Sequence, residues 1–281
     1  IDMEVDNSNQ IRDNKIILFA NQKGGVGKTT SAVNLAGAFA DSGLNVLVID
    51  MDPQGNASTA LGIPHGSDDI TVYDVIEGRS SIQDAVKACP EFDTLDVVPS
   101  SIDLSGAELE IVDMDNRTGL LKQQLDNYIN NSDKHYDYVI IDCAPSLGLL
   151  VLNALCAVHE VLIPIQAEYY ALEGLGQLLN TIQLVQNSLN HNLVISTMLV
   201  TMFDKRTLLS REVYGEIKEH YKDIVLDATI PRSVRISEAP SFNQTIITYD
   251  PKGNGSIAYR EAALEINNRD EGIIARLHGD G

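Results

Sequence analysis

Residues 16–40 read IILFANQKGGVGKTTSAVNLAGAFA. A short apolar run, a glycine-rich loop and a longer pattern rich in small residues follow one another, which predicts a strand, a tight turn and a helix. In such a turn, glycines let backbone N–H groups close around phosphate oxygens, a lysine can meet the β- and γ-phosphates, and a threonine hydroxyl can bind Mg²⁺. The stretch therefore predicts a phosphate-binding loop that ends in Gly27, Lys28 and Thr29.

The spacing of the glycines in this loop is unusual. The common phosphate-binding loop has a glycine five positions before the glycine of its Gly-Lys pair, and that position is occupied here by Gln22. The loop instead follows the pattern K-G-G-x-G-K-[ST], which adds a second lysine, Lys23. Lys23 lies too early in the loop to duplicate the contact expected of Lys28, so it either has a separate role or is a solvated lysine on the loop.

The rest of the chain alternates short apolar runs with longer amphipathic ones. The runs are continuously apolar, which is typical of strands in a parallel sheet that is covered on both faces. Alternation of this kind predicts an α/β fold with a single doubly wound, mostly parallel sheet and helices on both faces. Residues 1–14 are polar and aperiodic and are expected to be a flexible arm, so that residues 15–281 form one domain. The predicted strands are residues 16–20, 45–50, 95–100, 136–142, 160–165, 193–200 and 224–230, and the clearest helices are 28–43, 148–158, 172–189 and 207–221.

Composition and charge limit the classes of function. The 281-residue chain is 44% hydrophobic and 21% charged, has no apolar run long enough to span a bilayer, and begins with a segment too polar for a signal peptide. Its three cysteines form no CxxC pair and its six histidines have no metal-ligand spacing, so a reducing cytoplasm without structural zinc is expected. The net charge of −20 argues against non-specific attraction to nucleic acid or to anionic membranes.

Three aspartates stand at the ends of predicted strands. Asp50 and Asp52 end the second strand, and side chains two apart on a strand point the same way, so both can face a nucleotide bound at the loop. The alternative for each is a turn or capping role, since the turn residues PQGN follow. Asp142 ends the run YVIID, where a carboxylate can hold Mg²⁺ through water. The adjacent Cys143 has no histidine partner nearby and is expected to pack in the core.

Further segments extend a resemblance to a known family. They are VIDMDPQGN (48–56), YDYVIIDCAPSLG (136–148), QAEYYALEGL (166–175), LVTMFDKRT (199–207) and IPRSVRISEAPS (230–241). With the two-lysine loop, the chain resembles the deviant Walker A ATPases of the ParA/MinD group, and within it the ParA (Soj) type of chromosome or plasmid partition ATPase, from about Lys15 to about Glu265. The resemblance implies a Mg²⁺-dependent ATPase that hydrolyses ATP to ADP and phosphate. The nucleotide-binding loop would comprise Lys23, Gly24, Gly25, Val26, Gly27, Lys28, Thr29 and Thr30.

The resemblance also implies roles for single residues. Lys23 would cross a dimer interface to the phosphates bound by the other subunit, as an arginine finger does. Asp52 would orient the attacking water, while Thr29, Asp50 and Asp142 would lie at or near the Mg²⁺ ion. The segment around Met202 and Phe203 and the loop that begins at Pro231 would border the adenine, and Arg206 and Arg235 would contact DNA. The family often has two prolines after the position of Cys143, and Ala144 replaces the first of them here.

Other members of the group can be told apart by their sequences. A MinD-like membrane protein would end in a basic amphipathic helix, which the tail EINNRDEGIIARLHGDG lacks. An iron–sulfur protein of this group would need cysteines placed to hold a cluster, and a tyrosine kinase would have a cluster of tyrosines at its C-terminus; the sequence has neither. A purely structural nucleotide-binding module would be expected to lose Lys23 or Asp52, and both are present. Residues 205–235 carry seven basic and five acidic side chains, so this region is mildly basic in an acidic chain.

The sequence is therefore interpreted as a partition ATPase of the ParA (Soj) type. It implies an ATP-bound sandwich homodimer that binds double-stranded DNA without sequence preference and binds no membrane. A ParB-type centromere-binding partner would stimulate hydrolysis and release the dimer. The protein would be cytoplasmic, and associated with the nucleoid when ATP is bound. Whether the cargo is a chromosome or a plasmid is left open.

Overall fold

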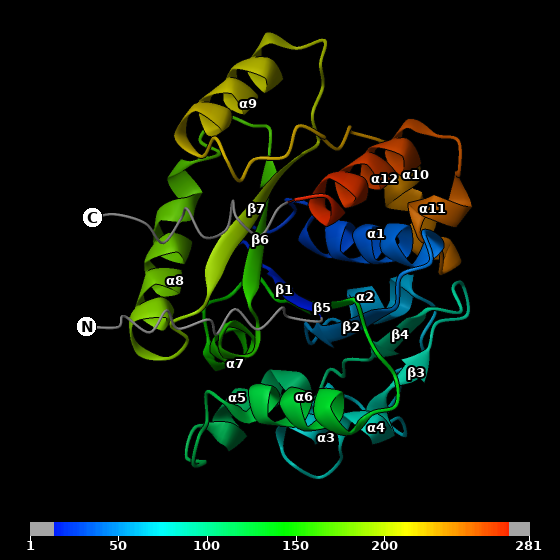
Figure 1. Cartoon of the computed structure of the whole chain (residues 1–281), viewed down its shortest axis with the longest axis vertical. Coiled ribbons are helices and arrows are strands. Elements are labelled where there is room, and N and C mark those ends of the chain that lie inside the picture. The colour runs from blue at the N-terminus through cyan, green and yellow to red at the C-terminus, as the bar shows by residue number, and fades with distance from the viewer. Residues whose placement is uncertain (1–13, 270–281) are drawn as a thin grey trace, which may run out of the picture.

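Seven strands form one sheet in the order β3-β4-β2-β5-β1-β6-β7 in the computed structural model, which describes residues 14–269 (Figure 1). All neighbouring strands are parallel except β3 and β4. The expectation of a flexible arm over residues 1–14 falls, apart from the last residue, outside the described residues. The strands are β1 Lys15–Phe19, β2 Val46–Met51, β3 Lys87–Ala88, β4 Leu95–Val98, β5 Tyr138–Cys143, β6 Glu160–Gln166 and β7 Val194–Thr201.

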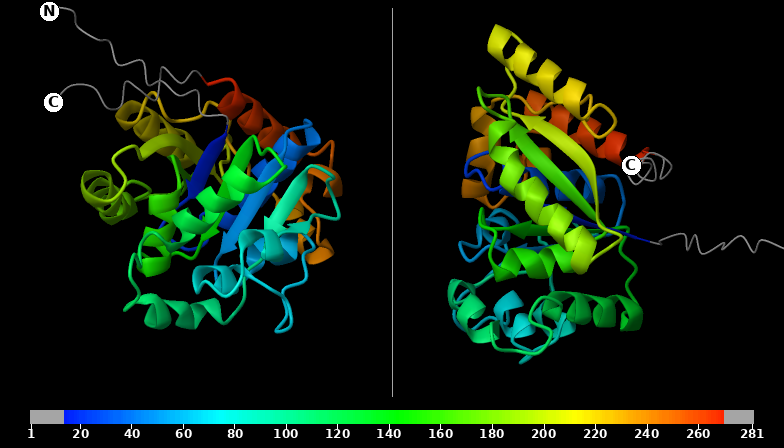
Figure 2. Two further views of the ribbon diagram at one scale, coloured as in Figure 1. Left: turned by 60° about the horizontal axis from the view of Figure 1, so that its bottom comes forward. Right: turned by 90° about the vertical axis from the view of Figure 1, so that its left-hand side faces the viewer.

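Helices cover both faces of the sheet (Figures 1 and 2). Helices α1, α2, α10, α11 and α12 share one hydrophobic core with the sheet, and α3 to α9 share the other. The predicted doubly wound α/β architecture is thereby confirmed. The helices are α1 Lys28–Asp41, α2 Asn56–Ala60, α3 Val72–Ile76, α4 Ile82–Ala85, α5 Leu104–Ile111, α6 Leu120–Asn131, α7 Leu149–Ala157, α8 Gly176–Ser188, α9 Leu208–His220, α10 Val234–Glu238, α11 Ile246–Tyr249 and α12 Asn254–Asn267, with 3-10 turns at Glu173–Leu175 and Ala239–Phe242.

Burial on both faces explains why the strands are continuously apolar. Along β1, Ile16 and Leu18 point into one core, and Ile17 and Phe19 point into the other. Side chains alternate between the two faces of a strand, so a sheet with two cores needs apolar residues at every position. No helix within residues 14–269 combines the length and the apolar character that crossing a membrane requires.

The register of the central strands fixes where polar side chains gather. Strand β1 lies between β5 and β6, and β5 in turn pairs with β2. Asp50 of β2 and Asp142 of β5 are direct partners across this ladder, and Phe19 at the end of β1 is level with Asp142. Parallel strands that end together bring the loops that follow them to one edge of the sheet, where ligands bind in such folds.

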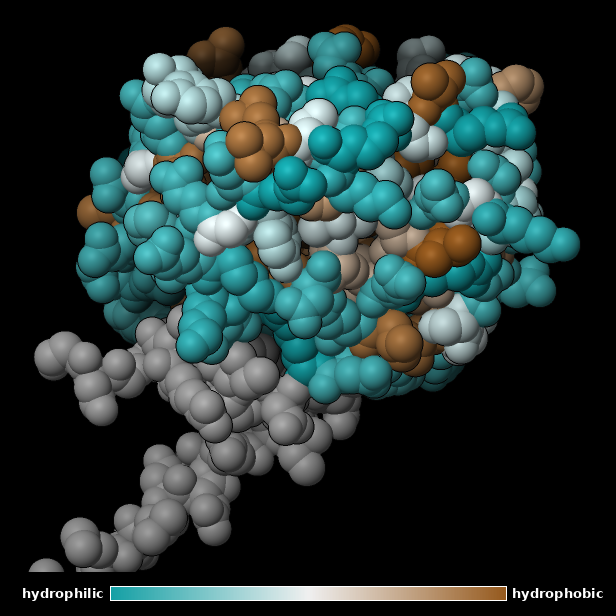
Figure 3. Space-filling model, turned by 90° about the horizontal axis from the view of Figure 1, so that it is seen from above, coloured by the Kyte–Doolittle hydropathy of each residue, from teal (hydrophilic) through white to brown (hydrophobic). Residues whose placement is uncertain are grey.

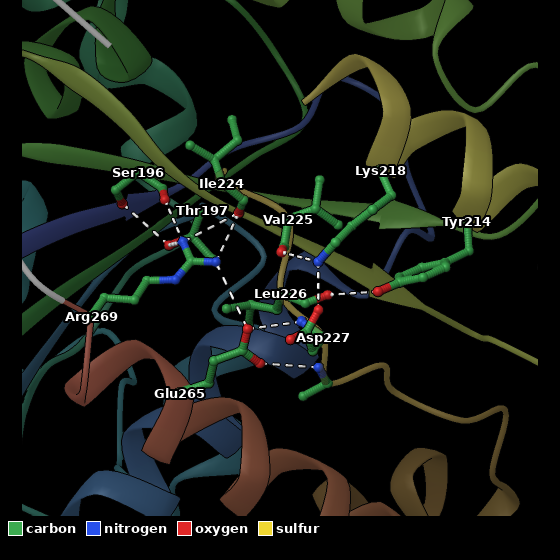
Figure 4. A network of polar contacts seen from close by, with 11 residues as sticks. Ser196, Thr197, Tyr214, Lys218, Ile224, Val225, Leu226, Asp227, Glu265 and Arg269 are labelled. Carbon is green, nitrogen blue, oxygen red and sulfur yellow. Dashed lines mark hydrogen bonds and ion pairs between the residues drawn. The ribbon is translucent and has the colours of Figure 1, made fainter. Parts of the chain in front are cut away.

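The prediction of a strand at residues 224–230 is wrong. This segment makes only an isolated bridge between Val225 and Met198, and side chains take up several of its backbone hydrogen bonds (Figure 4). Arg269 donates to the carbonyl of Ile224 at 3.2 Å, and the N–H of Asp227 donates to a carboxylate oxygen of Glu265 at 2.8 Å. Lys218 and Tyr214 of α9 donate to the carbonyls of residues 225 and 226 at 3.0 and 3.3 Å. The two ends of the run, residues 224–226 and Ile230, are buried and bond to the backbone of Met198 and Val200 in β7, but the exposed Asp227 and the half-buried residues after it interrupt the pairing.

Candidate functional site

The loop between β1 and α1 has the backbone geometry of an anion site. Gly25 and Gly27 have φ values of 75° and 79°, in the left-handed region that favours glycine. Gly27 directly precedes α1, whose first turn contains no acidic residue. The first N–H groups of a helix have no partner within the helix, and the helix dipole adds partial positive charge there. The loop therefore offers backbone donors and positive potential to a phosphate.

Hydrogen bonds to two other strands, β6 and β7, hold the loop in this shape. Asn21 donates from Nδ2 to the carbonyl of Pro164 at 2.8 Å and accepts the N–H of Lys23 on its Oδ1 at 3.0 Å. Thr201, the last residue of β7, donates from Oγ1 to the carbonyl of Val26 at 2.7 Å. These two anchoring residues were not identified from the sequence. Asn21 stands inside the loop motif and could have been singled out there, whereas the only sequence signal for Thr201 is its position at the end of a predicted strand.

Thr29 and Asp142 form the polar centre of the site. The Thr29 hydroxyl donates to Asp142 Oδ2 at 2.7 Å, and Asp142 Oδ1 accepts no hydrogen bond from any residue within 14–269 although it is buried. Burial raises the pKa of Asp142 to about 7, the positive charge of Lys28 opposes this rise, and the nearby Asp50 adds to it. Lys28 itself is only 8% exposed. A buried carboxylate with an unused oxygen beside a lysine and a hydroxyl fits a site for a divalent cation.

Asp50 is bonded differently from Asp142. One of its oxygens accepts the Ser58 N–H at 2.9 Å and the Ser58 hydroxyl at 2.7 Å, and the other accepts the N–H of Asp52 at 3.1 Å. Burial raises the pKa of Asp50 to about 6, and the Ser58 hydrogen bonds limit the rise. Asp50 is therefore neither an N-cap nor a turn residue, since it lies within β2 and the N-cap of α2 is Gly55, but its carboxylate ties the end of β2 to α2.

Asp52 lies in the turn after β2, is 5% exposed and is held from two sides. Its Oδ1 accepts the N–H of Gln54 at 3.0 Å, and its carbonyl accepts the Ser100 hydroxyl at 2.6 Å. The structure thus brings Asp52 to the same edge of the sheet as Asp50 and Asp142, although Asp52 lies after the last residue of β2 and not within the strand as expected. Among residues 14–269 no three His, Cys, Asp or Glu side chains gather to hold a metal, so an ion here would take other ligands from a bound nucleotide.

The Lys23 ammonium is paired with a residue outside this centre. Its side chain is 49% exposed, and Nζ lies 3.3 Å from Oε2 of Glu168, in the loop that follows β6. Tyr169 and Tyr170 come next in that loop, are 66% and 69% exposed, and stack edge to face. An exposed ion pair contributes at most about 1 kcal/mol, so Lys23 can leave Glu168 at little cost.

The two segments expected to border the adenine lie together in the structure. Phe203 and Pro231 form an isolated parallel bridge, in which the Phe203 N–H donates to the carbonyl of Ile230 at 2.9 Å. Met202 has a φ of 51°, a left-handed conformation uncommon for a side chain of this kind. The first segment follows the carboxyl end of β7, and the second begins after Ile230, whose N–H donates to the carbonyl of Val200 in β7 at 2.9 Å. The structure therefore pairs them beside the site, and their contact with a base stays a prediction.

The two arginines expected to contact DNA are exposed and have acidic partners. Arg206 donates to Asp204 through Nε and a terminal nitrogen at 3.0 and 2.9 Å, and this pair lowers the pKa of Asp204 to about 2. Arg235 lies 3.8 Å from a carboxylate oxygen of Asp250 and over the ring of Tyr249 at 5.4 Å. The face that includes α9 is largely hydrophilic, with separate apolar spots (Figure 3).

The raised pKa of Asp142 predicts how stability changes with pH. Because the folded pKa of about 7 exceeds the ordinary 3.8, the folded protein binds more protons between these values, and its free energy of unfolding falls as pH rises through this window. In chelator, the free energy of unfolding of Asp142→Asn should therefore exceed that of the parent at pH 8, by on the order of 4 kcal/mol, and should lie close to the parent's at pH 4. Thermal melts of both proteins at the two pH values measure this. Equal differences at both pH values would contradict it.

Comparisons with known proteins agree with this geometry. A family model described as an AAA domain matches residues 14–195. The sporulation initiation inhibitor protein Soj of Bacillus subtilis is 49% identical over 252 residues, which cover 90% of this chain and 98% of that protein. The chromosome partitioning protein ParA of Caulobacter vibrioides is 46% identical over 91% of this chain and 95% of its own. A cobyrinic acid a,c-diamide synthase from Mycobacterium smegmatis, solved with bound ADP and magnesium, is 36% identical with a TM-score of 0.78, covering 90% of this chain and 94% of that one. The chain belongs to the ParA/Soj family of chromosome-partitioning ATPases, within the AAA-domain proteins.

Proposed function

We propose that this chain is a Mg²⁺-dependent ATPase whose ATP-bound dimer binds DNA and leaves it after hydrolysis. The observation that carries the proposal is the joining of Lys28, Thr29 and Asp142 at the start of α1, where a buried acceptor lies unused beside a buried lysine. Such a set suits a nucleotide phosphate together with a divalent cation. The structural neighbour solved with ADP and magnesium supports both ligands.

Each residue at the site has a part in this proposal. Gly24, Gly25, Val26, Gly27 and Thr30 supply loop and first-turn backbone to the phosphates, and the Lys28 ammonium donates to the β- and γ-phosphates. Thr29 and Asp142 supply oxygens to Mg²⁺, which when bound neutralises charge on the phosphates. Asp50 orders the end of β2 near this ion, and the carboxylate of Asp52 orients the attacking water. Met202 and Pro231 lie against the base.

Lys23 has its proposed role in the dimer. In the single chain its ammonium pairs with Glu168, away from its own Lys28 site. We infer that a second subunit offers phosphate oxygens to this ammonium, which then leaves Glu168. Charge supplied from across an interface both joins the subunits and stabilises the transition state.

Variants of this ion pair should shift dimerisation in opposite directions. Lys23→Ala should bind ATP as a monomer, because the ammonium it removes acts across the interface. Glu168→Gln should dimerise with ATP at a lower protein concentration, by up to about fivefold, since no exposed ion pair competes for the lysine. Sedimentation velocity with ATP over a protein concentration series measures both effects. ATP-dependent dimerisation of Lys23→Ala equal to the parent would refute the role.

DNA binding by the dimer tests the whole proposal. The ATP-bound form should bind duplexes of unrelated sequence equally, and the ADP form should bind weakly, because a dimer places two basic regions on one body. Affinity should fall with salt with a log–log slope of about −0.9 for each phosphate neutralised. Anisotropy titrations of labelled duplexes across a salt series measure these quantities. Equal binding by the ATP and ADP forms would contradict the proposed cycle.

Substitutions of the two arginines, and of the acidic partner of Arg206, test the same proposal more specifically. Arg206→Ala and Arg235→Ala should each weaken binding and flatten the salt slope by roughly one unit for each phosphate that is no longer neutralised. Asp204→Asn should instead strengthen binding severalfold, because it removes the carboxylate that competes with phosphate for Arg206. Melting temperatures separate these effects from loss of folding. A DNA affinity that stays at the parent value in all three variants would rule out this surface.

Two further elements of the proposal follow from the family. A ParB-type centromere-binding protein would stimulate hydrolysis, and the ATP-bound protein would be found on the nucleoid within the cytoplasm. The names of the Soj and ParA relatives support a segregation role.

A further inference from the structure

A tight turn connects Asp52, at the end of β2, to the start of α2. The N–H of Gly55 donates to the carbonyl of Asp52 at 2.9 Å, which closes the turn. Gly55 is the N-cap of α2 and has a φ of 65°, in the left-handed region that favours glycine. Because the side chain of Asp52 projects from this turn, the position of its carboxylate depends on how firmly the turn is held.

The imidazole of His65 covers one side of this turn. A methyl group placed on Gly55 would lie 2.6 Å from Cε1 and 2.9 Å from Nδ1 of His65, so the ring packs directly against the Cα of Gly55. The ring shares a hydrogen bond of 3.0 Å between its Nε2 and Oγ1 of Thr59, on α2. Gly55 is buried as a result, although its neighbours in the turn, at positions 54 and 56, are exposed. His65 therefore fills the space that a side chain at position 55 would need.

The backbone on both sides of His65 is held in place. Lys87, the first residue of β3, donates from Nζ to the carbonyl of Pro64 at 3.0 Å and also pairs with Asp69. A carboxylate oxygen of Asp69 accepts the N–H of Gly66 at 2.8 Å. The residues before and after His65 are thus tied to one ion pair, so that the segment keeps the ring over the turn.

The interior side of the same turn is held by other groups. Ser100 donates from Oγ to the carbonyl of Asp52 at 2.6 Å, and its N–H donates to Oγ of Ser58 at 3.0 Å. Ser58 is fully buried in α2, whereas the next residue, Thr59, is exposed and bonds to His65. Two serines therefore hold the turn from the interior, and the imidazole holds it from the solvent side.

We propose that His65 is a positioning residue for ATP hydrolysis, which holds the turn through Gly55 so that Asp52 can orient the attacking water. This inference rests on the role proposed for Asp52. A reacting group that is displaced by about 1 Å can lose on the order of a hundredfold in rate, so a contact that fixes it contributes to the rate without touching the substrate. ATP binding is assigned to the loop before α1, and the ring makes its contacts with the turn before α2. His65 should therefore act on the rate of hydrolysis and not on the affinity for ATP.

The test compares kcat and KM of ATP hydrolysis in variants of the full chain. His65→Ala should lower kcat about tenfold and leave KM and the affinity for ATP at the parent values, because only the turn after β2 is loosened. His65→Gln keeps a hydrogen-bonding group for Thr59 and should recover most of the lost rate. His191→Ala is the matched control, because that imidazole is exposed and bonds to the carbonyl of Gln186 at 2.7 Å, between α8 and β7. It should hydrolyse ATP as the parent does.

Two combined variants locate the effect. In a chain that carries Asp52→Asn, His65→Ala should slow hydrolysis no further, because the carboxylate that the turn positions has already lost its charge. Gly55→Ala places a methyl group where the ring lies, so it should displace the ring and slow hydrolysis at least as much as His65→Ala does. Combined with His65→Ala, it should slow hydrolysis by less than the product of the two single effects, since both remove the same contact.

Three outcomes would overturn the proposal while leaving the role of Asp52 intact. The first is a parent-like kcat in His65→Ala. The second is a further loss when His65→Ala is added to Asp52→Asn, since the ring would then act on another group. The third is a loss of ATP affinity equal to the loss of kcat, which would indicate a general loosening of the fold. Hydrolysis at the parent rate by Asp52→Asn alone would instead refute the proposed role of Asp52, so the two failures are distinguishable.

Discussion

Lys28→Ala is expected to lose ATP binding by at least about a hundredfold, because a charged donor at a largely buried site is removed and its acceptors are left without it. Lys28 is 8% exposed and acts electrostatically on Asp142, so its ammonium already stands in the polar centre. Calorimetric titration with ATP and Mg²⁺ measures the change.

The matched control for Lys28 is the other lysine of the same loop. Lys23→Ala should keep the ATP affinity of the monomer, since its ammonium is paired with Glu168 and not with the centre. A melt of each variant without nucleotide shows that both are folded. If Lys28→Ala binds ATP as tightly as the parent, the loop is not the nucleotide site.

Asp52→Asn is expected to lower the rate of ATP hydrolysis by about a hundredfold or more while ATP still binds. The amide keeps the shape and the acceptor for the Gln54 N–H, and the backbone contact with Ser100 does not depend on the side chain. What disappears is the negative charge that we propose orients the attacking water. Single-turnover hydrolysis measures the loss, and sedimentation with ATP should show a dimer that persists. Hydrolysis at the parent rate would remove Asp52 from the reaction.

Much of the fold could be predicted from the sequence because burial leaves a local pattern. Strands β1, β2, β5, β6 and β7 are covered on both faces and are therefore apolar at nearly every position. The same rule misled at residues 224–230, whose apolar ends are buried but whose backbone groups bond largely to side chains of α9, α12 and Arg269. The short antiparallel strand β3 was not predicted, since a strand of two residues is too short to show a hydrophobic pattern.

The sequence by itself determined the phosphate loop and the positions of the three aspartates, because glycine spacing and strand ends are local properties of the chain. Only the tertiary structure decided how those residues differ. Asp50 accepts hydrogen bonds from Ser58 on one of its oxygens, whereas Asp142 meets Thr29 from 113 residues away and keeps one oxygen without a donor among residues 14–269. Lys23 meets Glu168 across 145 residues. Hydrogen bonds and ion pairs form between whichever groups packing brings together, and local periodicity carries no information about such distant partners.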